Sequence, residues 1–317
     1  MKSAAVTPGT VPRLDTLLDV AVIGEQLRRI FGPDAGQVVG AELVDHKPGH
    51  RALVAYRTKA KLFPETIYGK AYDTTSVAAR TFDLMTRFAS YSAPRPLGVL
   101  PELALVVYVP LAGRSLDTMV GSGTMTDGLA GAGRWLGVLH GSDLELPRVL
   151  DVGHEADNAA SWADLVGECH PERGTPAARL ASALTAAAPP PPSQTVPIHK
   201  DFQYQHVIVS DGVGVVDLDE ARMGDPAADV AHFCVYLRLL ALRARAADGV
   251  ADAWVRSFCD AYGSDTGTAF AWFAAYTCMK IAKQLTTGRG PRPRPQGRAK
   301  EEQLDWALRE GLRWLGG

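Results

Sequence analysis

Three side chains that could carry acid–base or metal chemistry flank one predicted hairpin. Asp201 and His206 precede an apolar strand, and Asp217 follows the strand that returns from the turn Asp211-Gly212. Because a hairpin places the segments flanking its strands side by side, we expect these three side chains to converge. Clustered carboxylates repel each other unless a cation or a hydrogen-bond donor lies between them. The pattern therefore predicts a Mg²⁺ site beside a general base.

A second motif follows the hairpin, Gly224-Asp225-Pro226 with Asp229 three residues later. Asp before Pro is the typical start of a helix, with the carboxylate as N-cap and proline at the first helical position. We expect Asp225 to begin a helix over residues 227–246. Asp229 then falls in the first turn of that helix.

The elements that must position these residues change in character along the chain. The first part reads as a helix, three strands, a helix and two further strands, whereas helices dominate after Gly113, apart from the short strands around the hairpin. This order predicts an α+β fold in which a small sheet lobe with one packed helix (14–109) precedes a larger, mainly helical lobe (110–317). A ligand is expected in the cleft between the lobes.

Residues 1–13 are expected to be a disordered tail. The strands are expected at 38–44, 52–56, 66–72, 97–100, 103–109, 196–199, 207–209 and 213–217, and the helices at 14–31, 74–88, 125–140, 161–168, 177–187, 227–246, 251–262, 266–285 and 300–314.

Composition excludes several classes of protein. The formal net charge is −2 and the pI is about 6.4, which argues against a nucleic-acid binder, because such proteins carry a basic excess. No stretch reaches the ~20 apolar residues that a membrane span needs, and the N-terminus lacks the apolar core of a signal peptide. We therefore expect a cytoplasmic protein, monomeric or homodimeric, with neither nucleic acid nor membrane as a partner.

His199-x-Asp201, Asp217 and the Gly-Asp-Pro motif with Asp229 together resemble the aminoglycoside phosphotransferase and choline kinase family, the small-molecule branch of the protein-kinase-like fold. The resemblance spans roughly residues 38–287. It implies a bilobal fold and transfer of the γ-phosphate of ATP, or alternatively GTP, with Mg²⁺ or Mn²⁺. By the same resemblance, Asp201 is the base that accepts the proton of the substrate hydroxyl, and Asp217 is the Mg²⁺ ligand.

The resemblance also implies a nucleotide site. Lys70 would pair with the α- and β-phosphates, and the turn containing His50 and Arg51 would cover the phosphates. The backbone of four residues would bond the adenine edge: Tyr108, Val109, Pro110 and Leu111. His199, Asp225 and Asp229 are expected to be structural, with His199 buried and ordering the catalytic loop, and Asp229 bracing it.

The chain departs from the family pattern at two places. His206 stands where the family has Asn, and an imidazole nitrogen suits transition metals better than Mg²⁺. Three alternatives follow: His206 binds Mg²⁺ or Mn²⁺ weakly, it acts through water, or the second metal is absent. Gln205 is an alternative source of oxygen. The helix expected at 74–88 contains no Glu to hold Lys70, and Asp83 is its only carboxylate.

The acceptor is expected to be a small alcohol. Only six residues separate Asp217 from Gly224, which leaves no room for the segment that docks a peptide in protein kinases. An antibiotic, a sugar, a nucleoside or an amino alcohol would fit, and an antibiotic would imply a role in resistance. Candidate contacts are Asp219, Glu220, Arg222 and the side chains from His232 to Arg238. The arginine- and proline-rich segment 288–298 is either an interhelical loop or an anion clamp. The rival interpretation is a catalytically silent kinase-like protein that binds nucleotide or a partner.

Overall fold

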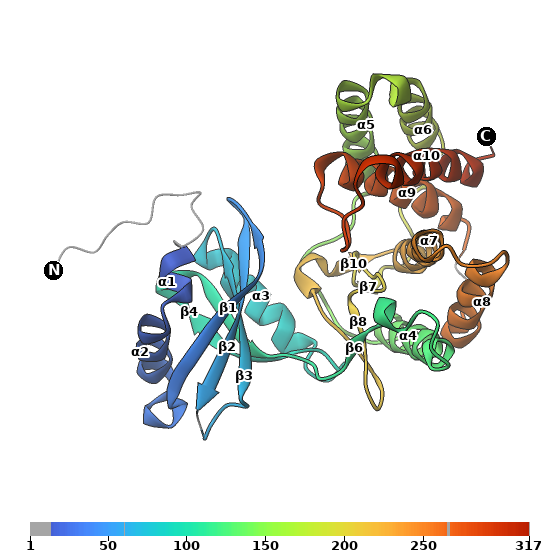
Figure 1. Ribbon diagram of the computed structural model, residues 1–317. Coiled ribbons are helices and arrows are strands. Elements are labelled where there is room, and N and C mark those ends of the chain that lie inside the picture. Colours follow the sequence, from blue (N-terminus) through green and yellow to red (C-terminus); the bar gives the residue numbers. More distant parts are fainter. Residues whose placement is uncertain (1–13, 60, 265–266, 317) are drawn as a thin grey trace. The chain divides into compact units, whose positions relative to one another are not determined.

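The computed structural model describes residues 14–59, 61–264 and 267–316, so the predicted tail 1–13 lies outside the described residues. Contacts divide the chain into two compact units, residues 1–112 and 113–317. The sequence placed this boundary between residues 109 and 110. Each unit is described separately below, with the element labels of Figure 1.

The first unit is built on a five-stranded antiparallel sheet in the order β1-β2-β3-β5-β4. Strand β2 alternates buried and more exposed residues, as expected for a strand with one face on the core. Strand β5 is instead buried along nearly its whole length. The strands are β1 (Gln37–Lys47), β2 (Arg51–Lys59), β3 (Thr66–Tyr72), β4 (Arg95–Leu100) and β5 (Leu105–Val109).

Three helices pack against this sheet. The helix predicted at 14–31 is two helices, α1 (Leu14–Leu18) and α2 (Val20–Phe31), because the Asp19 side chain accepts hydrogen bonds from the Ala21 and Val22 amides and starts a new helix. Apolar residues of α1 and α2 share a core with β2. Helix α3 (Thr75–Arg87) packs on strands β3, β4 and β5. Three helices therefore pack on the sheet, whereas the sequence predicted one packed helix and a single separate helix at 14–31.

Two small sheets carry the catalytic segments of the second unit. Strands β8 (Val207–Val209) and β9 (Val213–Val215) form the predicted hairpin, extended by the two-residue strand β6 (Arg114–Ser115). Strand β7 (Val196–Ile198) pairs with β10 (Arg222–Gly224) instead. Neither β6 nor β10 was predicted, because neither is an apolar run beside a turn signal such as Asp211-Gly212.

The remainder of the second unit is helical. Helix α7 is buried on nearly all sides over its first fifteen residues, which is why it shows no apolar stripe. Within the described ranges, no helix is both long and apolar enough to cross a membrane. The helices are α4 (Met125–His140), α5 (Val152–Cys169), α6 (Gly174–Ala186), α7 (Ala227–Ala244), α8 (Val250–Tyr262), α9 (Phe270–Thr287) and α10 (Gly297–Trp314).

Candidate active site

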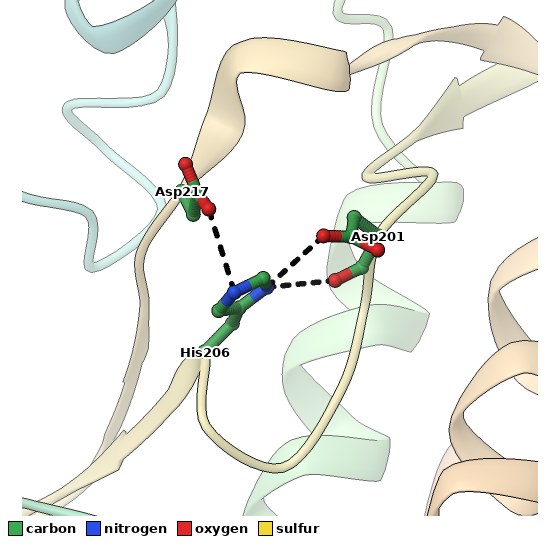
Figure 2. Close-up of side chains that lie close together, drawn as sticks. All are labelled: Asp201, His206 and Asp217. Carbon is green, nitrogen blue, oxygen red and sulfur yellow. Dashed lines mark hydrogen bonds and ion pairs between the residues drawn. The ribbon is translucent and has the colours of Figure 1, made fainter. Parts of the chain in front are cut away.

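Asp201, His206 and Asp217 come together at one end of the β8–β9 hairpin. One ligand atom from each lies within 4.8 Å of the others. Figure 2 shows the His206 ring between the two aspartates, with Asp201 on the loop after β7 and Asp217 just beyond β9. The hairpin accounts for this proximity, because the Val216 amide donates a 2.9 Å hydrogen bond to the His206 carbonyl and continues the β8–β9 ladder.

The hydrogen bonds of His206 define which ring nitrogen faces Asp217. His206 Nδ1 lies 2.8 Å from the backbone oxygen of Asp201, an acceptor, so Nδ1 carries a proton. His206 Nε2 lies 3.4 Å from Asp217 Oδ2. In the neutral ring Nε2 holds a lone pair, so two electron-pair donors point toward a common position, as a metal site requires.

The Asp201 carboxylate contacts two further cation-forming side chains. Lys280 Nζ donates a 2.7 Å hydrogen bond to Asp201 Oδ1, and His232 Nε2 lies 3.3 Å from the same oxygen. Burial raises the pKa of Asp201, but Lys280, the hydrogen bond from His232 and the nearby imidazoles together hold it well below its usual range. Asp201 is therefore ionised at neutral pH.

Lys280 was not predicted from the sequence as a site residue, and His232 was predicted only as one of several candidate substrate contacts. Lys280 lies 79 residues beyond Asp201, so no local motif links them. A weak signal was present, because Tyr276, Lys280 and Gln284 recur at a spacing of four in a helix whose first part is mainly apolar. That spacing places them on one polar face of α9.

One buried carboxylate fixes the backbone of the catalytic loop. Asp229 is fully buried in α7 and accepts hydrogen bonds from the amides of His199 (2.6 Å) and Lys200 (2.7 Å). His140 Nε2 lies 3.2 Å from it, and His140 is oriented in turn by the Tyr262 hydroxyl. Burial raises the pKa of Asp229, yet its hydrogen bonds to His140 and the loop bring the net value below the usual range.

His199 connects the loop to the segment that carries Asp217. Its Nε2 donates a 3.0 Å hydrogen bond to the Val216 carbonyl, and its Nδ1 accepts from the Asp201 amide at 3.3 Å. Both ring nitrogens are thus used by a neutral imidazole. Burial lowers the pKa of His199, which keeps the ring neutral. Asp217 has a left-handed backbone, with φ of 64°.

A second charged cluster adjoins the catalytic loop. Lys200 Nζ lies 2.9 Å from Glu155 Oε1, and the Tyr276 hydroxyl donates to the other Glu155 oxygen. Burial lowers the pKa of Lys200, and the neighbouring cations Lys280 and Arg222 lower it further against the opposing effect of Glu155. Helices α5 and α9 are thereby linked to the loop through one ion pair.

The remaining predicted residues of this unit have identifiable contacts. Asp225 accepts a 2.8 Å hydrogen bond from the Ala227 amide at the start of α7. Arg222 pairs with Glu220 at 2.5 Å, and the backbone oxygen of Asp219 accepts a hydrogen bond from Arg148. Glu220 and Arg222 therefore neutralise each other.

Gln205 binds the arginine-rich loop. Its Oε1 accepts from the Arg292 amide (3.0 Å), and its Nε2 donates to the Arg292 carbonyl (2.6 Å) and to Asp117 (3.0 Å). The Gln205 carbonyl oxygen that was considered as an alternative ligand is therefore already hydrogen-bonded. Hydrogen bonds between the Gln205 side chain and the Arg292 backbone therefore hold the loop between α9 and α10 against the segment 199–206.

The predicted nucleotide-binding residues lie in the first unit. Lys70 lies on β3 with 8% of its surface exposed, and its Nζ is 5.7 Å from the centre of the Tyr72 ring. Asp83 of α3 pairs with Arg87 at 2.8 Å. His50 lies in the turn between β1 and β2, Arg51 is the first residue of β2, and β5 ends at Val109, within the predicted segment 108–111.

The chain also resembles known proteins. Residues 68–275 match the phosphotransferase enzyme family. No curated protein matches the chain by sequence similarity.

Solved structures share its fold. A provisionally assigned aminoglycoside phosphotransferase from Ralstonia eutropha has a TM-score of 0.67 at 12% identity, covering 94% of this chain and 98% of its own. A choline kinase from Streptococcus pneumoniae scores 0.63 at 14% identity (92% and 98%). A spectinomycin phosphotransferase in complex with ADP and spectinomycin scores 0.61 at 11% (92% and 98%). These likenesses confirm the predicted bilobal, kinase-like α+β fold. With the match over residues 68–275, they establish that the chain belongs to the phosphotransferase enzyme family.

Proposed function

We propose that the protein transfers the γ-phosphate of ATP to a hydroxyl group of a small molecule. The observation that carries this proposal is the convergence of an ionised Asp201 with His206 and Asp217 within 4.8 Å, in a chain of the phosphotransferase family. A structural similarity to enzymes alone would support the fold and not the reaction.

Asp201 would orient the substrate hydroxyl and accept its proton. Its low pKa makes it a weak base before the reaction begins. This suits phosphoryl transfer through a loose transition state, where the attacking oxygen forms little bond and positioning supplies most of the catalysis. Lys280 and His232 would hold the carboxylate toward the attacking hydroxyl.

Asp217 and His206 are proposed as the ligands of the divalent cation. The donor set fits such an ion, because a carboxylate oxygen and the free imidazole nitrogen already face each other at 3.4 Å. The cation would neutralise charge on the transferred phosphate. Because nitrogen replaces the usual oxygen ligand, Mn²⁺ is expected to serve at least as well as Mg²⁺.

In the first unit, Lys70 is proposed to pair with the phosphates, with His50 and Arg51 covering them and the backbone of 108–111 holding the adenine. Lys70→Ala should clearly raise the KM for ATP, and it should lower the free energy of unfolding only slightly. Asp219 and Glu220 remain candidate contacts for the acceptor.

The test is a transfer assay on the purified protein, with ATP, Mg²⁺ or Mn²⁺, and a panel of hydroxyl compounds. Asp201→Asn should lower phosphate transfer by roughly 10²–10⁴-fold while leaving ATP binding intact. Asp211→Asn, in the exposed hairpin turn, is the matched control and should leave transfer unchanged. If the parent binds ATP with the cation yet transfers phosphate to no compound, the silent, nucleotide-binding alternative is correct.

His206 is tested separately through metal preference. We expect His206→Asn to shift the ratio of Mn²⁺- to Mg²⁺-supported transfer toward Mg²⁺, since an amide oxygen replaces the nitrogen ligand. A ratio identical to that of the parent would count against a metal role for His206.

A further inference from the structure

Two lysines of α9 lie one turn apart, and the first of them, Lys280, contacts Asp201. Lys280 uses one of its three N–H donors for Asp201, which leaves two directions open to a ligand. Lys283, one turn further, lies 5.2 Å from the centre of the Trp162 ring. Across the described ranges, no acidic side chain pairs with Lys283. Burial lowers the pKa of Lys283, and Lys280 and Arg289 lower it further, so these cations lie within electrostatic range of one another.

Two more cations extend this surface, and every acid beside them is already paired. Lys200 pairs with Glu155, and Arg222 pairs with Glu220. Lys280 and Arg222 both act on Lys200 electrostatically, which connects the two pairs to the α9 lysines. Glu155, Glu220 and Asp201, the acids that these cations contact, therefore each have a cationic partner. Lys283 contacts the Trp162 ring and lies near the further cations Lys280 and Arg289.

We infer that the acceptor alcohol of the proposed reaction carries an anionic group, a carboxylate or a phosphate, that is bound by Lys283 and by the free donors of Lys280. This inference deepens the proposed function and rests on it. A polyamine acceptor would have to displace Lys280 from Asp201 and approach an unpaired Lys283. Two like charges 4 Å apart repel by about 4 kcal/mol at the dielectric constant typical of a protein surface. An anionic acceptor meets the opposite interaction at both lysines.

The experiment uses one sugar scaffold in four charge states: glucuronate and glucose 6-phosphate as anions, glucose as the neutral form and glucosamine as the cation. Binding to the whole chain is measured by saturation-transfer NMR and calorimetry. The protein is first saturated with ADP and Mg²⁺, so that the phosphate group of a sugar cannot occupy the nucleotide site. We expect at least one anion to bind roughly tenfold more tightly than glucose, and glucosamine to bind most weakly. Comparison of the two anions distinguishes a carboxylate from a phosphate site. The preference should weaken with added salt.

Lys283→Gln should remove most of the preference for the anion, and Lys300→Gln, a lysine of α10 outside this surface, should leave it unchanged. The inference is overturned if glucosamine binds as well as the anions, if no charge preference is found, or if the preference survives in Lys283→Gln. Failure of the proposed function looks different: the anions bind through Lys283, but ATP transfers no phosphate to any acceptor. Conversely, phosphate transfer to a hydroxyl group of amine-bearing acceptors, in preference to anionic acceptors, would retain the proposed function and refute the charge inference.

Discussion

At the scale of single residues, the site depends on buried polar groups whose hydrogen bonds are nearly all internal. Asp229 is the clearest case, since its two oxygens hold consecutive amides of the catalytic loop. Such a group has no water to replace a lost partner, so removing an acceptor exposes the full cost of an unpaired buried amide.

Asp229→Asn should destabilise the protein by about 1–3 kcal/mol, because one of its two acceptor oxygens becomes a donor facing an amide. We also expect a lower kcat with little change in the KM for ATP, since the loop that carries Asp201 loses an anchor. Urea unfolding and steady-state kinetics measure the two effects. Asp127→Asn, on the exposed surface of α4, is the control. Wild-type stability in Asp229→Asn would contradict the bracing role.

From the ion pair between Lys280 and Asp201 we predict how the activity depends on pH. Without the Lys280 ammonium, burial dominates and the pKa of Asp201 rises. The proposed base Asp201 can accept a proton only when it is ionised. If its pKa is raised, activity is therefore lost at a higher pH when the solution is acidified. The kcat/KM profile of Lys280→Gln, recorded from about pH 5 to pH 9, should show an acid limb displaced upward. An acid limb at the parental position would mean that Lys280 does not control Asp201.

At the scale of elements, close approach between helices fixes the second unit. Gly133 of α4 faces α8, and a Cβ atom added there would lie 2.4 Å from the Phe258 carbonyl oxygen. Backbone atoms cannot yield as a flexible side chain can, so the two helices would have to separate.

Gly133→Ala should therefore lower the free energy of unfolding by about 1–3 kcal/mol, even though alanine has the higher helix propensity. Gly123→Ala provides the comparison, because a Cβ atom at Gly123 has no neighbour within 4 Å. Thermal unfolding of both variants gives the measurement, and equal melting temperatures would refute the packing explanation.

The elements also show how far the sequence was informative. Periodicity placed α4 at its observed bounds, and the hairpin turn placed Asp201, His206 and Asp217 beside one another. Helix α5 begins at Val152 and not near residue 161, because the Asp151 carboxylate caps it and its first turns carry little apolar pattern. Lys280 could not be linked to Asp201, since that contact depends on how α9 packs and not on local sequence. Tertiary contacts of this kind leave no fixed spacing in the chain.

At the scale of the whole molecule, neutral buried histidines couple stability to pH. The pKa of His232 is lowered from 6.5 to about 4, mainly by burial and further by Lys280. Between these values the unfolded chain binds a proton that the folded chain does not, so stability falls as the pH is lowered from 6.5 toward 4. His199 contributes with the same sign.

His232 alone should account for roughly 3 kcal/mol of this loss. All six tryptophans lie in residues 113–317, so urea unfolding followed by tryptophan fluorescence reports on the unit that contains His232. His232→Gln should reduce the dependence of the unfolding free energy on pH over this range. An unchanged slope would show that other groups are responsible.

The left-handed backbone at Lys200 (φ 70°) and Asp217 (φ 64°) has an evolutionary consequence. Lysine rarely adopts this conformation, aspartate and asparagine adopt it occasionally, and glycine adopts it at the lowest cost. Each position thus retains a conformation that costs about 1 kcal/mol because its side chain is needed there. If the protein transfers phosphate as proposed, a descendant that lost this activity would gain stability by drifting to glycine at residues 200 and 217, so those two positions would record the loss before the fold changed.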